Sequence, residues 1–417
     1  MISKLLYIDP GTGSMLFSII IGITGVLVFA LRATLIKLKF VFSGGRSKGN
    51  DSDNLPIVVF TEGKRYWNCF KPICDEFEKR EVDLHYLTLD PKDPALTADY
   101  KFIHPEFIGE GNKGIAKMNL LKADLVVATT PSLDVFQWKR SKGVKYYVHY
   151  LHAANDPTLY RMFGLDFYDS ILISGKYQED EIREIEKIRE LPQKELVMAG
   201  IPYMDTMKER LTASTQEKAK SDVPTVIMAP SWGSNSLLNM YGAPLIRNLL
   251  DSNYKVIIRP HPQSFISEKE VIDKLMAEFP DSDTLQWNRD PDNFEVLNKS
   301  DILISDFSGI LFDYSLVFNK PIIYSIPEFD KSQYDASWLD DDMTWTFKTF
   351  PKIGKELNKD NFENIAGLIN ECLNGASAQA LSQGRDLARE ETWYDIGNGA
   401  KNVADYLISK HKTIASH

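Results

Sequence analysis

Short apolar runs alternate with helical stretches along most of this chain, and no other feature restricts its fold as strongly. Amphipathic stretches such as NCFKPICDEFEKR and YQEDEIREIEKIRE separate the runs, which are rich in Val, Ile, Leu and Tyr. Strands that alternate with such helices predict a parallel sheet covered by helices on both faces, so the chain is expected to belong to the α/β class. The first series of predicted strands covers residues 56–61, 82–89, 124–130, 145–151, 170–174 and 196–200.

A polar stretch divides the predicted strands into two series. TMKERLTASTQEKAKSD, at residues 206–222, has few apolar side chains to bury. We therefore predict two Rossmann-like domains, residues 51–215 and residues 216–417. The closing helical segments could pack on either domain, and we group them with the second. The second series of predicted strands covers residues 225–231, 255–261, 284–287, 301–305 and 321–325.

The N-terminal segment indicates a membrane anchor. It is uncharged from Pro10 to Leu31 and supplies the roughly 20 apolar residues that a spanning helix needs. A cleaved signal peptide is the alternative, but the run exceeds the roughly 7 to 15 residues of its apolar region. Lys and Arg residues are concentrated at 32–48, after the segment. The positive-inside rule then predicts a single-pass anchor and basic linker in residues 1–50, with both domains on the cytoplasmic side of the cell membrane.

Composition and missing motifs exclude several function classes. The net charge of -10 and the pI near 5.3 argue against nucleic acid as a partner, because phosphate contacts need a basic face. The three cysteines form no CxxC pair, so we expect neither a disulfide framework nor a metal site. The chain has no Walker loop, HExxH or GxSxG motif, and no GxGxxG follows the first strand. We therefore predict no cofactor.

Polar residues gather at the carboxyl ends of the predicted strands, where α/β proteins bind their ligands. Two of them are histidines from opposite domains, and histidine reaches both protonation states near neutral pH. The alternative for His152 is a half-buried histidine bonded to backbone. IRPHP holds a cation and an imidazole in a stiff turn, which suits a phosphate, or else it is a proline turn with an incidental histidine. The candidate residues are Glu62, Lys64, Arg65, His152, Ser231, Arg259, His261, Ser305, Asp306, Ser308 and Gly309.

The stretch ISDFSGILFDYSLVF places polar residues between a predicted strand and a predicted helix. Ser308 is expected to be the N-cap of this helix, and Gly309 would let a ligand approach the backbone closely. A helix start presents unpaired N–H groups that bind phosphate readily. The alternative is that Ser308 caps the helix and has no other role.

Taken in order, these motifs resemble the CDP-glycerol glycerophosphotransferase family, the enzymes of teichoic-acid-like polyol phosphate polymers. YLHAAND falls where the family has its Trp-His-Gly-Thr signature, and IIRPHP is similar to its Arg-x-His-Pro turn. SDILISDFSGILFDYSLVFNKPIIY is the closest match, and the resemblance covers most of residues 56–408. It implies a GT-B architecture, in which two Rossmann-like domains face each other across a cleft. It also implies that a CDP-activated donor is the substrate and that the acceptor is lipid-linked or a glycan.

The resemblance further implies a role for each candidate residue. His152 and His261 would be catalytic, His152 as the base that removes a proton from an acceptor hydroxyl. Arg259 and His261 would contact the donor pyrophosphate. The remaining donor-binding residues would be Ser231, Ser305, Asp306, Ser308 and Gly309, and the acceptor-binding residues Glu62, Lys64 and Arg65.

This sequence departs from the family pattern at two places. Ala153 and Ala154 replace the Gly-Thr that follows the family's histidine, and Gly309 stands where a second serine is common. The identity of the donor and the acceptor therefore stays open. A GT-B glycosyltransferase that uses a sugar nucleotide and an inactive membrane-bound nucleotide-binding protein are the alternatives.

Overall fold

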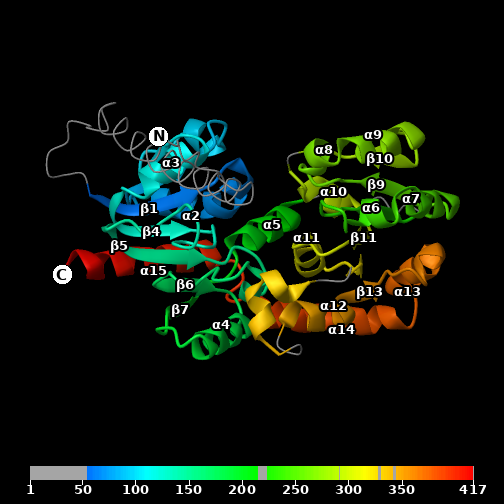
Figure 1. Cartoon of the computed structure of the whole chain (residues 1–417). Helices are drawn as coiled ribbons and strands as arrows, with labels where there is room; N and C mark the ends of the chain where they lie inside the picture. The colour runs from blue at the N-terminus through cyan, green and yellow to red at the C-terminus, as the bar shows by residue number, and fades with distance from the viewer. Residues whose placement is uncertain (1–53, 215–222, 291, 327–329, 341–343, 417) are drawn as a thin grey trace, which may run out of the picture. The chain divides into compact units, whose positions relative to one another are not determined.

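A computed structural model describes residues 54–214, 223–290, 292–326, 330–340 and 344–416 of the chain (Figure 1). The expected anchor and linker in residues 1–50, and the expected domain junction at residue 215, lie outside the described residues. Within the described residues, every helix is too short or too polar to cross a bilayer.

The first domain contains a parallel sheet with the strand order β3-β2-β1-β4-β5-β6-β7. The chain order reverses between β1 and β4, which creates the crevice where α/β sheets bind ligands. The strands are Leu55–Thr61 (β1), Leu84–Thr88 (β2), Ile103–Phe107 (β3), Lys122–Ala128 (β4), Gly143–Tyr150 (β5), Ser170–Ile173 (β6) and Glu195–Met198 (β7). The helices of this part of the chain are Trp67–Lys79 (α2), Gly111–Met118 (α3), Lys176–Ile188 (α4) and Pro202–Ala213 (α5).

Side chains of β1 fill the cores on both faces of this sheet, because successive residues of a strand point to opposite faces. Ile57 and Val59 pack in one core with residues of α2, while Val58 and Phe60 pack in the other with residues of α3 and α4. A strand buried on both faces needs apolar residues at every position. This explains the unbroken run PIVVF.

The second domain repeats this design with the strand order β10-β9-β8-β11-β12-β13, again parallel throughout. Its strands are Thr225–Met228 (β8), Lys255–Ile258 (β9), Leu285–Trp287 (β10), Ile302–Ser305 (β11), Ile322–Tyr324 (β12) and Gly354–Glu356 (β13). Its helices are Leu237–Met240 (α6), Gly242–Asp251 (α7), Ser264–Ser267 (α8), Lys269–Glu278 (α9), Phe294–Lys299 (α10), Ile310–Phe312 (α11), Trp345–Ile353 (α12), Ile365–Leu373 (α13) and Ser377–Thr392 (α14). A π-helical segment, Asp313–Val317, continues α11. The two sheets confirm the predicted pair of Rossmann-like domains.

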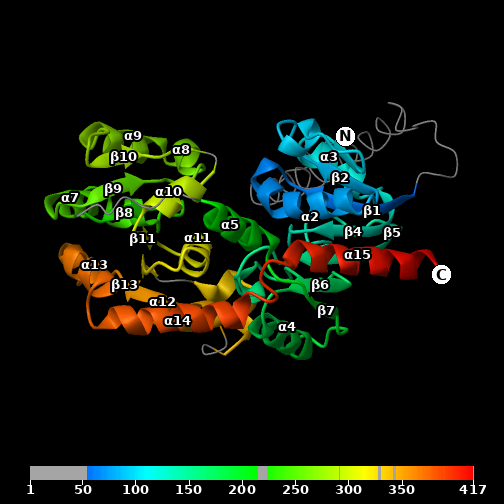
Figure 2. The same ribbon diagram turned by 180° about the vertical axis from the view of Figure 1, so that it is seen from behind.

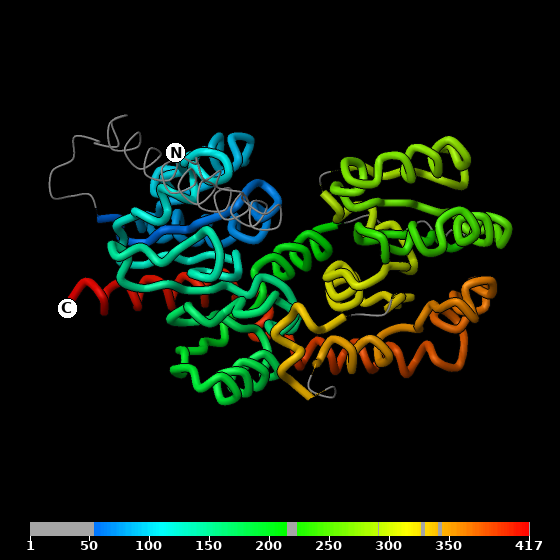
Figure 3. Tube along the Cα trace, in the orientation of Figure 1, coloured from blue at the N-terminus to red at the C-terminus, as the bar shows by residue number. Residues whose placement is uncertain are grey.

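The last helix, α15 (Gly399–Ala415), differs from the expected grouping with the second domain. Its buried residues Val403, Ala404 and Leu407 belong to the core that contains Val59 of β1. Figures 1 and 2 show α15 beside the first sheet, and Figure 3 traces the chain back to that sheet after α14. The amphipathic pattern of α15 predicted a helix with one buried face. The pattern does not indicate against which of the two domains that face packs.

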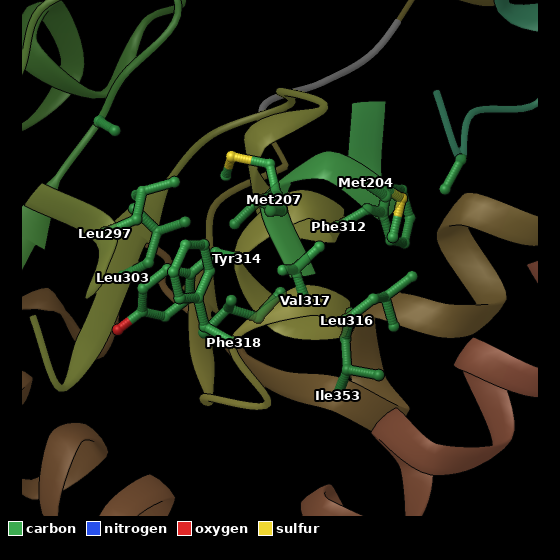
Figure 4. Packing of buried hydrophobic residues seen from close by; sticks show 14 of the residues in the cluster. Met204, Met207, Leu297, Leu303, Phe312, Tyr314, Leu316, Val317, Phe318 and Ile353 are labelled. Carbon is green, nitrogen blue, oxygen red and sulfur yellow. The ribbon is translucent and has the colours of Figure 1, made fainter. Parts of the chain in front are cut away.

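One core joins the two domains. Met204 and Met207 of α5 pack among side chains of the second domain, including Phe312 and Val317, as Figure 4 shows. Ala154, from the loop after β5, belongs to the same core. The loop that carries His152 is therefore packed against the segment that follows β11.

Candidate active site

The loops that follow β8 and β11 meet at the reversal point of the second sheet, and Asp306 fastens them together. Its carboxylate accepts hydrogen bonds from the backbone N–H groups of Ser231 and Leu237, both at 2.7 Å. The Ser305 Oγ donates to the carbonyl of Ala229 at 2.5 Å. Burial raises the pKa of Asp306, and the two N–H groups oppose this shift. Ser231, Ser305 and Asp306 thus lie together, and these hydrogen bonds fix the shape of the loops.

Ser308 does not have the capping role that we expected. The residue that precedes α11 is Gly309, in helical conformation, and no side chain caps the helix start. Ser308 instead lines a pocket of about 140 Å³ with Asn155, Tyr160 and Gly309. Ser308 takes part in the helix start through its backbone, since its carbonyl accepts a hydrogen bond from the N–H of Leu311 at 3.2 Å.

A cavity of about 330 Å³ brings residues of both domains together. His152 and Arg65 from the first domain line it, as does Gly309 from the second. A Cβ atom added to Gly309 would lie 3.6 Å from the Asn155 amide, which is ordinary contact, and its φ of -59° is open to any residue. Glycine is therefore not required by the backbone here, and its effect is to leave the cavity open.

His152 is held in this cavity as a neutral imidazole. Its ring contacts Tyr66 edge-on, with 5.6 Å between ring centroids, and its Nδ1 is buried without a hydrogen-bond partner among the described residues. Burial, followed by the positive charge of Arg65, lowers the pKa of His152 to about 4. At neutral pH this imidazole can accept a proton.

Arg65 also acts on the second predicted histidine. Partial burial and the charge of Arg65 lower the pKa of His261, while Asp306 and Glu268 oppose the shift. Arg65 is therefore close enough to influence the histidines of both domains, which supports their predicted convergence. His261 Nδ1 accepts a hydrogen bond from the backbone N–H of Gln263, 3.1 Å away.

Arg259 lies beside Asn288, to which its guanidinium donates a hydrogen bond. Its backbone N–H donates to the carbonyl of Met228, so β9 holds it next to β8. Burial lowers the pKa of Arg259, and the carboxylates of Asp290 and Asp292 oppose this shift. Arginine remains charged under all ordinary conditions, so a partly buried cation is available near the reversal point.

The three predicted acceptor-binding residues, which follow β1, do not all lie in the cavity of His152. Glu62 forms an ion pair with Arg65 at 2.7 Å, but it also lines a separate hollow of about 870 Å³ at the ends of β1 and β4. The backbone N–H of Lys64 donates to Asp90 at 3.3 Å, and the side chain of Lys64 is exposed. Of the three predicted acceptor residues, Arg65 alone lines the cavity of His152.

Several residues that line the cavity were absent from our sequence prediction, among them Asn155, Tyr203, Asn293 and Asp313. Asp313 had a signal, because it is the one charged residue in the apolar stretch GILFDYSLVF. Asn155 lies three residues after His152, in the same loop. Tyr203 comes from α5 and Asn293 precedes α10, and neither sequence indicates that these residues approach His152. Across the described part of the chain, no three His, Cys, Asp or Glu side chains are grouped so as to hold a metal ion.

Comparison with known proteins indicates the family and the fold of the chain. The family model "CDP-Glycerol:Poly(glycerophosphate) glycerophosphotransferase" matches residues 158–366, half of the chain. The teichoic acid glycerol-phosphate primase of Bacillus spizizenii is 21% identical over 254 residues, which cover 58% of this chain and 59% of that protein. The chain thus spans about three fifths of the length of this curated relative.

Two solved structures share the fold. The wall teichoic acid polymerase TagF superimposes with a TM-score of 0.55 at 16% identity, over 94% of this chain and 99% of TagF. The UDP-GlcNAc 2-epimerase from Neisseria meningitidis gives a TM-score of 0.55 at 12% identity, over 85% of this chain and 99% of that one. At these identities the likeness concerns the fold. Together with the matched family model, the sequence motifs identify this chain as a member of the CDP-glycerol:poly(glycerophosphate) glycerophosphotransferase family.

Proposed function

We propose that this protein transfers glycerol phosphate, or a similar polyol phosphate, from a CDP-activated donor to a lipid-linked or glycan acceptor during synthesis of a cell-envelope polymer. The observation that carries the proposal is the neutral His152, which shares one cavity with Arg65 and with Gly309 of the opposite domain. Membership of the family supports the reaction class, and the TagF structure, which was soaked with CDPG, supports the donor.

The reaction is a displacement at phosphorus. The acceptor hydroxyl oxygen attacks the phosphorus atom of the polyol phosphate, and the bond from that phosphorus to the oxygen of CMP breaks. His152 takes the proton of the hydroxyl, and CMP leaves with the bonding electrons. Because the groups act by position and charge, no covalent enzyme intermediate is needed.

The second domain would bind the charged part of the donor. Arg259 and His261 stand at the end of β9, beside the loops that Asp306 holds together. Their positive charge, with His261 protonated, would stabilise the pyrophosphate and the departing CMP. The backbone after β11, at Ser308 and Gly309, would contact the same pyrophosphate.

The proposal includes membrane attachment through the N-terminal segment. The uncharged run that ends at Leu31, followed by basic residues, supports a single-pass anchor with the catalytic domains on the cytoplasmic side. An anchor would keep the cavity near a lipid-linked acceptor. Density-gradient flotation of the full chain with vesicles tests this point, since deletion of residues 1–50 should release the protein from them.

The decisive experiment measures CMP release. The full chain, incubated with CDP-glycerol and acceptor membranes, should release CMP, and His152→Ala should lower the rate by about 10²- to 10⁴-fold, the usual contribution of a general base. His104→Gln is the matched control, because His104 lies on the edge strand β3 and pairs with Asp83 at 2.7 Å. Undiminished release from His152→Ala would remove His152 as the base, while release of UDP from sugar nucleotides with none of CMP would favour a glycosyltransferase.

A further inference from the structure

Asp313 is a carboxylate without a partner in the cavity of His152. It begins the π-helical segment Asp313–Val317, whose other members are buried. No hydrogen bond or ion pair joins its carboxylate to any described residue. Burial alone raises the pKa of Asp313 to about 7. Near pH 7, about half of the molecules would therefore carry a charge on Asp313 that no hydrogen bond or ion pair from the described residues stabilises.

Two other buried carboxylates, those of Asp306 and Asp205, are well supplied with donors. Asp306 accepts two backbone N–H groups, and Asp205 accepts the indole N–H of Trp393 together with two backbone N–H groups. A buried polar group that lacks such bonds destabilises the folded protein, and more strongly when it is charged. Among the described residues no hydrogen bond or ion pair of Asp313 offsets this cost, so the group is suited to bind something that enters the cavity.

The other side chains of the cavity indicate the chemistry of that ligand. The walls carry the amides of Asn155 and Asn293 and the hydroxyl of Tyr203, which donates to Asn293 Oδ1 at 3.2 Å. Asp313 lies close enough to Tyr203 that its charge raises the pKa of that phenol further. Carboxylate, amide and phenol groups together recognise several hydroxyls, because each offers a hydrogen-bond acceptor or donor at a fixed point. At about 330 Å³, the cavity is at the lower end of the range for ligand pockets, which fits a small polyol better than a whole nucleotide.

We propose that this cavity is a polyol subsite in which the Asp313 carboxylate accepts a hydrogen bond from a hydroxyl held opposite His152. The inference rests on the proposed function and adds the group that the cavity binds. The hydroxyl belongs either to the polyol of the donor or to the terminal polyol of the acceptor, and the chemistry of recognition is the same for both. Asp313 is a binding residue in this arrangement, and the proton of the reacting hydroxyl still goes to His152.

The test compares wild-type full chain with Asp313→Asn, which keeps the shape of the side chain and removes the charge. Asp283→Asn, on an exposed loop of the same domain, is the matched control. Calorimetry gives the affinities for CDP-glycerol and for CDP, and initial rates of CMP release give the KM for the acceptor. A hydrogen bond to a charged group contributes enough that its loss changes affinity by roughly tenfold to a hundredfold. Thermal unfolding of each variant verifies the fold, and Asp313→Ser replaces Asp313→Asn if the latter unfolds.

The outcomes separate the two sources of the hydroxyl. If Asp313 binds the donor polyol, Asp313→Asn weakens CDP-glycerol and leaves CDP unchanged. If it binds the acceptor polyol, both affinities stay the same and the acceptor KM rises. Unchanged values of all three in a folded variant overturn the polyol subsite while the proposed function stands. A wild-type chain that binds neither compound and releases no CMP overturns the proposed function itself, and the subsite with it.

Discussion

Replacing Glu181 by glutamine should stabilise the protein at neutral pH. Glu181 of α4 is 1% exposed, and its Oε2 accepts a hydrogen bond from Thr158 Oγ1 at 2.6 Å. Its Oε1 is buried and has no hydrogen-bond partner among the described residues. Burial, followed by the nearby Asp156 carboxylate, raises the pKa of Glu181 to about 10. The folded protein therefore holds Glu181 neutral at pH 7.

The size of this stabilisation follows from the number of protons that the folded and the unfolded protein bind at each pH. The ordinary pKa of Glu181 is 4.5, so between pH 4.5 and about 10 the folded state binds a proton that the unfolded state has lost. The free energy of unfolding then falls as pH rises through this window, by about 1.4 kcal/mol per pH unit. From pH 4.5 to pH 7 the loss is at most about 3.4 kcal/mol, and this figure holds for any folded pKa well above 7. Glutamine cannot ionise, and its amide can still donate to Asp156 and accept from Thr158.

The assay is urea unfolding of both proteins from pH 4.5 to pH 8. Glu181→Gln should be about 3 kcal/mol more stable than wild type at pH 7 and nearly equal near pH 4.5. Glu184→Gln on the same helix is the control, because Glu184 is partly exposed and pairs with Lys187 at 3.1 Å. A surface pair of this kind contributes roughly 0 to 1 kcal/mol. If the free energy of unfolding depended on pH in the same way in Glu181→Gln and wild type, Glu181 would not be neutral in the folded protein.

Three further changes test other parts of the structure. Asp306→Ala leaves the N–H groups of Ser231 and Leu237 unpaired and should lower the free energy of unfolding by about 2 to 5 kcal/mol in urea; a loss below 1 kcal/mol would mean that the loops do not depend on it. Burial lowers the pKa of His149 to about 3, so the free energy of unfolding should fall by about 1.4 kcal/mol per pH unit as the pH drops below 6.5. In His149→Phe the urea midpoint of unfolding should depend less on pH over this range. Gly309→Leu should fill the cavity and abolish CDP-glycerol binding in calorimetry with the melting temperature nearly unchanged, whereas Gly309→Ala should bind normally.

The sequence predicted the central strands of both sheets because they are buried on two faces and consist almost entirely of apolar residues. It missed β3 and β13, two of the four edge strands, whose sequences IHPEF and GKE resemble loops. An edge strand is half exposed and paired on one side, so its hydrogen bonds come from a neighbour and not from its own apolar pattern. The π-helical turn at Asp313 was likewise not predictable, because its geometry depends on packing around it.

The sequence predicted those site residues whose position is set by the end of a strand. It missed the residues that reach the site only through tertiary packing. His152, Arg259 and Asp306 follow directly from β5, β9 and β11, so a correct strand placed each one near an edge of its sheet. Ser308 was wrongly expected to cap a helix, since a serine before an apolar run gives the same signal whether or not it caps. Tyr203 comes from α5, and its approach to the cavity depends on the core shared by the two domains.

Glu181 lies near Asp156, which belongs to the loop that carries the proposed base, His152. Asp156, four residues after His152, accepts the backbone N–H groups of Trp345 and Thr346 at 2.6 and 3.0 Å, where α12 begins. Through these bonds the loop of the first domain is fastened to a helix of the second. Two ionised carboxylates could not share this buried place, because like charges repel strongly away from water. Burial and the neighbouring Asp156 carboxylate both favour the protonated form of Glu181, while the bonds that Asp156 accepts from α12 anchor the loop that carries His152.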